Sequence, residues 1–169
     1  ERALEEIVVT ANRREERLQD VGISVTALGS ASLNNLNINT ATDIVRAVPD
    51  DFLVLSGDDA LALPLMAIGG RGLISVCSNQ IPREMADMVE AAERGDFHAA
   101  RAIHQRVLGL MQVNFCESSP GPVKFSMAVM GLCEEQFRLP MVPPRQASKD
   151  RVLAVMRELG LPIVTSAAA

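Results

Sequence analysis

The sequence predicts an α/β protein in which a parallel strand–helix–strand unit is followed by several helices. Two apolar runs, at residues 52–55 and 73–77, lack alternation, as is typical of strands buried on both faces of a parallel sheet. The stretch between them is long enough for one helix, so the three elements form a parallel βαβ unit. Apolar residues make up 48% of the 169-residue chain, which provides a core and excludes a disordered protein.

The elements before residue 50 are short. Residues 7–10 are a β-branched run that predicts a strand, and residues 23–27 alternate between apolar and polar side chains, as in a half-buried strand. Between them, residues 12–20 are charged and expected to be solvated. Thr40 is the expected N-cap of a short helix that ends at Pro49.

The rest of the chain is mostly helical by pattern. In the βαβ unit, Asp58 or Asp59 is expected to cap the helix, and the glycines of residues 69–72 to end it. Four further helices are expected from their apolar spacing, their caps and their terminal glycines. They run from Pro82 to Gly95, from Asp96 through Phe115, from Ser119 to Gly131, and from near Ser148 to Gly160. The many methionines are interpreted as core filler.

Composition excludes several classes of function. The formal net charge is −5, so no basic surplus favours nucleic-acid binding. No run approaches the roughly 18 apolar residues of a membrane span. The 3 cysteines form no CxxC motif, and His98 and His104 lack the spacing of helical metal ligands, so we expect no metal site. Residues 69–72 are glycine-rich but precede a strand rather than a helix, which argues against a phosphate loop.

Four strings beyond residue 50 carry a family resemblance. They are FLVLSGDD at 52–59, GGRGLISV at 69–76, PGPVK at 120–124 and LPMVPP at 139–144. In order and spacing, over residues 50–162, they resemble the 4-hydroxy-tetrahydrodipicolinate synthase (dihydrodipicolinate synthase) family. That resemblance implies a partial (β/α)8 TIM barrel, containing the last two strands of the barrel and its C-terminal helical extension.

The same resemblance implies a chemistry that this chain does not complete. The family are pyruvate-dependent aldolases of lysine biosynthesis, in which a lysine on the strand before residues 52–55 forms a Schiff base and a tyrosine relays protons. Here no lysine precedes Lys124, which the family places in the helical extension, and the chain has 0 tyrosines. We therefore assign no catalytic residue, expect no cofactor, and leave enzymatic activity undecided.

Two substrate-binding positions are carried over from the family. Gly57 ends a barrel strand on the face where barrel active sites lie, and Ile74 matches a position whose main chain contacts pyruvate. Each has a simpler interpretation: Gly57 as a tight-turn glycine and Ile74 as a buried strand residue. Likewise Asp58 and Asp59 fit a turn and a cap better than an acid–base pair.

Residues 1–48 resemble a different family. The string EEIVVTA at residues 5–11 and the charged stretch after it resemble the TonB box and plug start of TonB-dependent outer-membrane receptors, although Gly22 replaces a usual proline. An exposed strand of this kind is captured by strand addition. All 9 prolines, 8 methionines and 3 cysteines lie at residue 49 or later, which supports a boundary there. We expect a plug-like segment at 1–49, a barrel part at 50–163 and a tail at 164–169.

Three functions are compatible with these residues. The chain is an aldolase, a receptor plug fragment, or a chimeric or truncated chain that is inactive alone; we favour the third for activity and the aldolase for ancestry. We expect pyruvate to bind at most weakly, and unpaired strand edges to promote self-association or a homo-oligomer. An energy-coupling protein is a partner only if residues 5–11 act as a TonB box. Because residues 1–6 are acidic and show no secretory leader, we expect a cytoplasmic protein, or an outer-membrane or periplasmic one if a leader lies upstream.

Overall fold

The structure of this chain is a computed structural model that describes residues 8–11, 14–17, 40, 43–45, 48–49 and 51–164. The chain divides into two compact units, Glu1–Ala47 and Val48–Ala169, and each is described by itself. No helix among the described residues is both long enough and apolar enough to span a membrane.

The first unit contains an antiparallel strand pair. Strands β1 (Val8–Ala11) and β2 (Arg14–Arg17) pair with Val8 opposite Arg17 and Ala11 opposite Arg14. The strand predicted near residues 7–10 is confirmed, but the charged stretch that follows also forms a strand, which was not predicted. Pairing with β1 provides the backbone partners that override its weak β-propensity. The strand predicted at residues 23–27 lies outside the described residues.

Thr40 acts as the predicted cap of a short helical segment. Its hydroxyl accepts a hydrogen bond from the amide of Asp43 (3.3 Å), and the Asp43 carboxylate accepts one in return from the Thr40 amide (2.9 Å). Residues 43–45 are helical. This reciprocal pair satisfies two backbone donors at the start of the turn.

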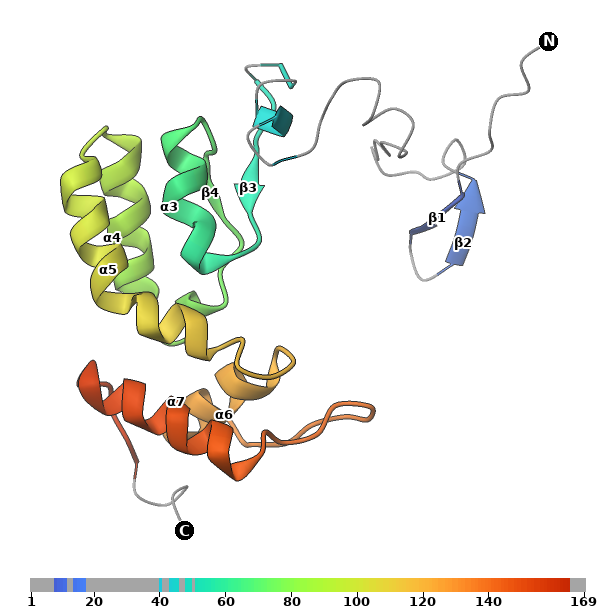
Figure 1. The fold of residues 1–169 in the computed structure, drawn as a ribbon. Helices are drawn as coiled ribbons and strands as arrows, with labels where there is room; N and C mark the ends of the chain where they lie inside the picture. The colour runs from blue at the N-terminus through green and yellow to red at the C-terminus, as the bar shows by residue number, and fades with distance from the viewer. Residues whose placement is uncertain are drawn as a thin grey trace. The chain divides into compact units, whose positions relative to one another are not determined.

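The second unit opens with the predicted parallel βαβ unit (Figure 1). Strands β3 (Leu55–Ser56) and β4 (Gly72–Leu73) pair in parallel, with Leu55 opposite Gly72, and helix α3 (Asp59–Ala67) connects them. Both strands are shorter than their apolar runs. Cys77 lies beyond β4, at the start of the 3-10 helix η2 (Cys77–Asn79).

The predicted burial of these strands on both faces is wrong for this chain. Phe52 is 55% exposed, Leu53 65%, Leu55 44% and Ile74 69%. In the described sheet β3 and β4 pair only with each other, so each has one unpartnered edge. The apolar side chains predict strands with other elements packed on both faces, and no described residues pack on these exposed side chains.

The turn between α3 and β4 depends on its glycines. Gly69 has a φ of 113°, in the region that favours glycine. At Gly70 a Cβ would lie 2.7 Å from the Leu65 side chain, and the Gly70 amide donates to the Leu65 carbonyl at 2.8 Å. The chain therefore leaves the helix in close contact with its last turn, and the predicted end of the helix at these glycines is confirmed.

The four remaining helices are confirmed close to their predicted bounds. They are α4 (Pro82–Glu93), α5 (Phe97–Val113), α6 (Gly121–Val129) and α7 (Gln146–Glu158). The Asp96 carboxylate accepts from the amide of Ala99 at 3.0 Å, so it caps α5 as expected. Gly95, Gly131 and Gly160 follow their helices with φ of 79°, 77° and 66°. The Asp96 cap marks the start of α5, and the glycines mark where α4, α6 and α7 end.

The core lies among the helices. In Figure 1, α3 lies beside the two strands, α4 and α5 lie next to α3, and α6 and α7 form a second layer below them. Met88, Leu110 and Met156 are fully buried, at 0% exposure. Methionines are prominent among these side chains, in agreement with their predicted role as core filler.

A buried polar cluster joins these layers. The Asn114 amide donates to Gln80 Oε1 (2.7 Å) and to Cys77 Sγ (3.2 Å), and the Gln80 amide donates to the Ser126 hydroxyl. Cys77 and Gln80 follow β4, Asn114 is the C-cap residue of α5, and Ser126 lies within α6. All four side chains are buried. Such satisfied networks fix one relative arrangement of the elements that they connect.

Candidate functional site

The candidate site lies at the carboxyl ends of β3 and β4. The strand register places Ser56 opposite Leu73, so Gly57 and Ile74 are the next residues on two adjacent parallel strands. The Ile74 amide donates to the Ser56 carbonyl at 2.8 Å, which holds the two ends together. Ligands of open and closed α/β sheets bind at this end of the strands. The structure thus brings the two predicted residues side by side.

The simpler interpretations of these two residues do not hold here. A Cβ built on Gly57 would meet no atom within 4 Å, and its φ is not in the positive region that requires glycine. Ile74 is exposed rather than buried. Turn geometry therefore does not explain the glycine at position 57, and core packing does not explain the isoleucine at position 74.

The adjacent aspartates have structural roles, as predicted. The Asp58 carboxylate accepts from the amides of Ala60 (2.8 Å) and Leu61 (3.3 Å), so Asp58 is the N-cap of α3. Asp59 is only 1% exposed and turns the other way, where it accepts from the Ser75 hydroxyl at 2.5 Å.

Asp59 also organises the chain after β4. Its Oδ2 accepts from the amides of Val76 (3.0 Å) and Cys77 (3.2 Å), so a first-turn residue of α3 caps η2 as well. These three bonds fix the segment that carries Ile74 relative to the helix that follows Gly57. The pair predicted as a turn and a cap is thus a cap and a bridge between the two strand ends.

Cys77 is not a nucleophile in this setting. Burial, with Asp59 close by, raises the pKa of the Cys77 thiol to about 12. The thiolate is the reactive form, so the thiol stays protonated and inert near neutral pH.

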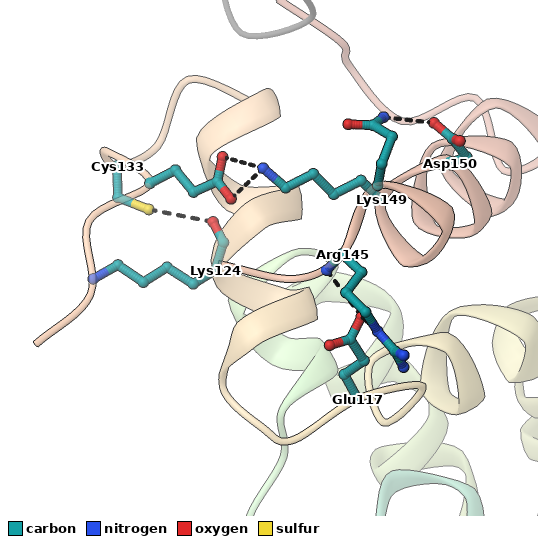
Figure 2. A network of polar contacts seen from close by, with 8 residues as sticks. Glu117, Lys124, Cys133, Arg145, Lys149 and Asp150 are labelled. Atoms are coloured by element: carbon teal, nitrogen blue, oxygen red, sulfur yellow. Dashed lines mark hydrogen bonds and ion pairs between the residues drawn. The ribbon is translucent and has the colours of Figure 1, made fainter. Parts of the chain in front are cut away.

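Both lysines of the chain lie in the helical layer and are engaged there (Figure 2). Lys124 of α6 donates to the Gln136 carbonyl, and its ammonium lies 5.3 Å from the centroid of the Phe137 ring. Lys149 of α7 lies 2.6 and 2.9 Å from the two carboxylate oxygens of Glu135. Neither environment resembles the enclosed apolar pocket that keeps a Schiff-base lysine neutral.

A small cavity lies beside α6. It has a volume of about 160 Å³, and its lining includes Glu117, Gly121, Met141 and Pro144. The Glu117 carboxylate accepts from the Arg145 amide at 3.0 Å and pairs with the Arg145 guanidinium at 3.5 Å. A hydrogen bond from Ser148, followed by those from Arg145, lowers the pKa of Glu117.

This contact predicts a measurable acid dependence. Because the pKa of Glu117 is lower in the folded chain, its contribution to stability is present above the unfolded pKa and is lost as the pH falls through the folded one. We expect thermal unfolding followed between pH 7 and pH 3 to show a smaller acid-induced fall in Tm for Glu117→Gln than for the parent chain. Glu93→Gln, at the exposed end of α4, should keep the parent's dependence; equal profiles for all three proteins would contradict the role of Glu117.

The histidines form no metal site. His104 Nε2 lies 2.9 Å from the Ala60 carbonyl, and His98 is exposed. In the part of the chain that the structure describes, no three His, Cys, Asp or Glu side chains are grouped to hold a metal ion.

Several functional contacts were not found by sequence reasoning. Glu117, Glu135 and the buried Gln80 had no motif to mark them, because their partners lie far along the chain: Gln80 pairs with Asn114, 34 residues away. The scarcity of lysine was the one available signal for Glu135, since only 2 ammonium groups needed partners.

Sequence similarity assigns this chain to a family. The sequence profile of the dihydrodipicolinate synthetase family matches residues 25–159. This chain belongs to that family. The matched range begins earlier than the resemblance over residues 50–162, and it includes part of the segment that was compared with receptor plugs.

The relatives are synthases that are longer than this chain. The chain is 51% identical over 119 residues to the 4-hydroxy-tetrahydrodipicolinate synthase of Koribacter versatilis, covering 70% of this chain and 40% of that protein. The dihydrodipicolinate synthase structure from Aquifex aeolicus has a TM-score of 0.71 and 41% identity, covering 73% of this chain and 42% of that one. The synthase of Acinetobacter baumannii, solved in complex with pyruvate, has a TM-score of 0.69 and 30% identity, covering 72% and 42%. The chain thus spans less than half the length of these relatives.

Proposed function

We propose that this chain supplies the C-terminal part of a 4-hydroxy-tetrahydrodipicolinate synthase and that it is inactive as an aldolase by itself. The family match and the parallel strand ends with Gly57 and Ile74 side by side support the first half of the proposal. The observation that carries the second half is the placement of the only two lysines in the sequence: Lys124 donates to the Gln136 carbonyl, and Lys149 pairs with Glu135.

The missing step is imine formation. In the family's chemistry, a neutral lysine amine attacks the keto carbon of pyruvate and water leaves; loss of a methyl proton then gives the enamine that attacks an aldehyde. The amine must be unprotonated, which requires removal from water and from carboxylates. Lys149 has a carboxylate at 2.6 Å instead, and Lys124 binds a main-chain carbonyl.

The proposed pyruvate site involves Gly57 and Ile74. We propose that their main chains form one wall of a pyruvate site. The open space beside Gly57 and the strand-end location of both residues support this role, as does the pyruvate complex of the relative from Acinetobacter baumannii. With one wall only, pyruvate is expected to bind this chain weakly.

The division of the chain is likewise a proposal: residues 1–49, 50–163 and 164–169, with the first part of different origin, which makes the chain a chimera or a truncated synthase. The composition shift at Pro49 supports that boundary, whereas the family match from residue 25 counts against it. We do not propose the receptor-plug or outer-membrane alternative, because no comparison favours it and β1, at the proposed TonB box, is already paired with β2.

Borohydride trapping tests the proposal. Incubation of the purified chain with pyruvate and sodium borohydride, followed by intact-mass measurement, is expected to give the unmodified mass, because neither lysine is available as a free amine in an enclosed site. The synthase of Aquifex aeolicus, treated in parallel, is the positive control for trapping.

An adduct mapped to Lys124 or Lys149 by peptide mass would contradict the proposed inactivity. Lys149→Arg and Lys124→Arg variants then separate a specific adduct from surface labelling, since a specific imine disappears with one substitution only.

A further inference from the structure

The loop at residues 131–145 connects α6 to α7 and extends away from both helices (Figure 1). It contains the string LPMVPP, which carries family resemblance but takes no part in the proposed pyruvate site. Residues 140–145 have the sequence PMVPPR. Two prolines three positions apart have the PxxP spacing of segments that dock in the aromatic-lined grooves of SH3-type domains. The arginine that follows them, Arg145, is suited to pair with a carboxylate beside such a groove.

The first arm of this loop is fixed at its base by both lysines of the chain (Figure 2). Lys149 of α7 lies 2.6 Å from one carboxylate oxygen of Glu135. Lys124 of α6 donates to the Gln136 carbonyl, and its ammonium lies 5.3 Å from the centroid of the Phe137 ring. Contacts from two different helices therefore define the path of the loop as it leaves the helical layer.

The second arm packs against the start of α6 along one edge. Met141 is half-buried and Pro144 is buried. A Cβ built on Gly121, the first residue of α6, would lie 3.4 Å from Pro144 Cγ. The Arg145 amide donates to the Glu117 carboxylate at 3.0 Å. These contacts hold the arm in place from its proline to its end.

The other two edges of the second arm face solvent. Val142 is 63% exposed, Pro143 is exposed, and the Arg145 side chain is 83% exposed. A polyproline II helix has three residues per turn, so side chains three positions apart share an edge. Burial at positions 141 and 144 fits such a helix with one edge on the protein. Arg145 has φ −64° and ψ 153°, close to polyproline II values, and each proline holds its own φ near them.

A turn determines where this extended stretch begins. The Met141 amide donates to the Arg138 carbonyl at 3.0 Å, and Leu139, within the turn, is 88% exposed. The stretch thus follows the turn, and the exposed side chains of residues 142–145 are those that a groove can contact. A segment already held in its bound conformation loses little conformational entropy on binding.

We propose that residues 141–145 are a preformed docking segment for a proline-reading protein domain of the SH3 class. Val142 and Pro143 fill an aromatic slot of that domain, and the Arg145 guanidinium pairs with a carboxylate at the edge of the slot. Arg145 Nε lies 3.5 Å from Glu117, and the exposure of the side chain leaves its guanidinium accessible to a partner. This inference is independent of the proposed aldolase ancestry and chemistry.

Titration of the full chain into a purified SH3 domain that binds PxxP peptides tests the proposal. This chain has 0 tryptophans, so the fluorescence of a tryptophan in the groove of the domain reports binding directly. We expect saturable binding with a Kd below about 1 mM. Pro143→Ala is expected to raise the Kd about tenfold, because it removes the ring that fills the slot and loosens the fixed backbone. Pro64→Ala, the same change at an exposed position of α3, is the matched control and should keep the parent's Kd.

The salt dependence of the Kd tests the role of the arginine. Binding of the parent chain is expected to weaken as ionic strength rises, because the proposed pair at Arg145 is at the rim of the interface. Arg145→Gln should raise the Kd and flatten this dependence. Arg101→Gln, at an exposed position of α5, is the control and should change neither quantity.

Three results would overturn the proposal: no saturation up to about 1 mM, the same Kd for both proline variants, or an unchanged salt dependence for Arg145→Gln. Light scattering of the chain alone is the further check. A dimer that Pro143→Ala dissociates would show that the segment binds a second copy of the chain instead, which also contradicts the proposal. If circular dichroism shows that Pro143→Ala does not fold, Val142→Glu, at a 63% exposed position, takes its place and is expected to raise the Kd by a similar factor.

Discussion

Replacing Asp59 with alanine is expected to lower the free energy of unfolding by about 3 kcal/mol. The carboxylate is 1% exposed and accepts three hydrogen bonds, from the Ser75 hydroxyl and the amides of Val76 and Cys77. Its removal leaves the buried Cys77 amide and the two part-buried donors without this acceptor, and a buried donor without a partner costs more than the bond itself contributed. Urea unfolding followed by circular dichroism at 222 nm measures the effect.

The neighbouring aspartate is the matched control for this prediction. Asp58→Ala removes an exposed N-cap and is expected to cost about 1 kcal/mol. Asp59→Asn should fall between the two alanine variants, because an amide keeps one acceptor oxygen. A smaller loss for Asp59→Ala than for Asp58→Ala would show that the bridge between α3 and η2 does not hold the strand ends.

The helices could be predicted because their signals are local. Asp96 caps α5 through an amide three residues away, and Gly95 and Gly131 adopt positive φ directly after their helices. Each of these interactions is complete within one turn of chain, so neighbouring residues were enough to place it. The βαβ unit was predictable for a related reason, since its helix must return the chain to start a parallel strand.

The strands could be recognised but not their surroundings. Residues 52–55 are apolar because a strand in the family's fold is covered on both faces, yet Leu53 is 65% exposed here. Sequence reports what a segment is suited to pack against, and only the structure reports whether that neighbour is present. Leu53 and Ile74 are therefore apolar without being part of the core of this chain.

In the candidate site, too, some residues could be predicted from the sequence and others could not. Gly57 and Ile74 came from a family resemblance, and the strand register brings them together. The Lys149–Glu135 pair and the Gln80–Asn114 pair join residues 14 and 34 positions apart, and no motif marks such pairs. Long-range polar partners depend on the packing of helices, which a sequence pattern does not encode residue by residue.

Leu110→Ala is expected to reduce the free energy of unfolding by 2–5 kcal/mol, roughly the range for leucine in a closed core. Leu110 is 0% exposed and lies on α5, the helix that packs against both α4 and α7. The substitution removes buried apolar area and leaves a cavity that the three helices cannot close without moving. Urea unfolding measures the change, with an unaltered m-value showing that the unfolding reaction itself is the same.

Leu139→Ala tests whether burial is the cause. The chemical change is identical, but Leu139 is 88% exposed, so its loss is expected to change stability by less than about 0.5 kcal/mol. The contrast also asks whether the helical layers have a core of their own. A cooperative transition that Leu110→Ala weakens and Leu139→Ala leaves alone shows that they do. Equal effects of the two substitutions would mean that α5 is not packed against α4 and α7 in solution.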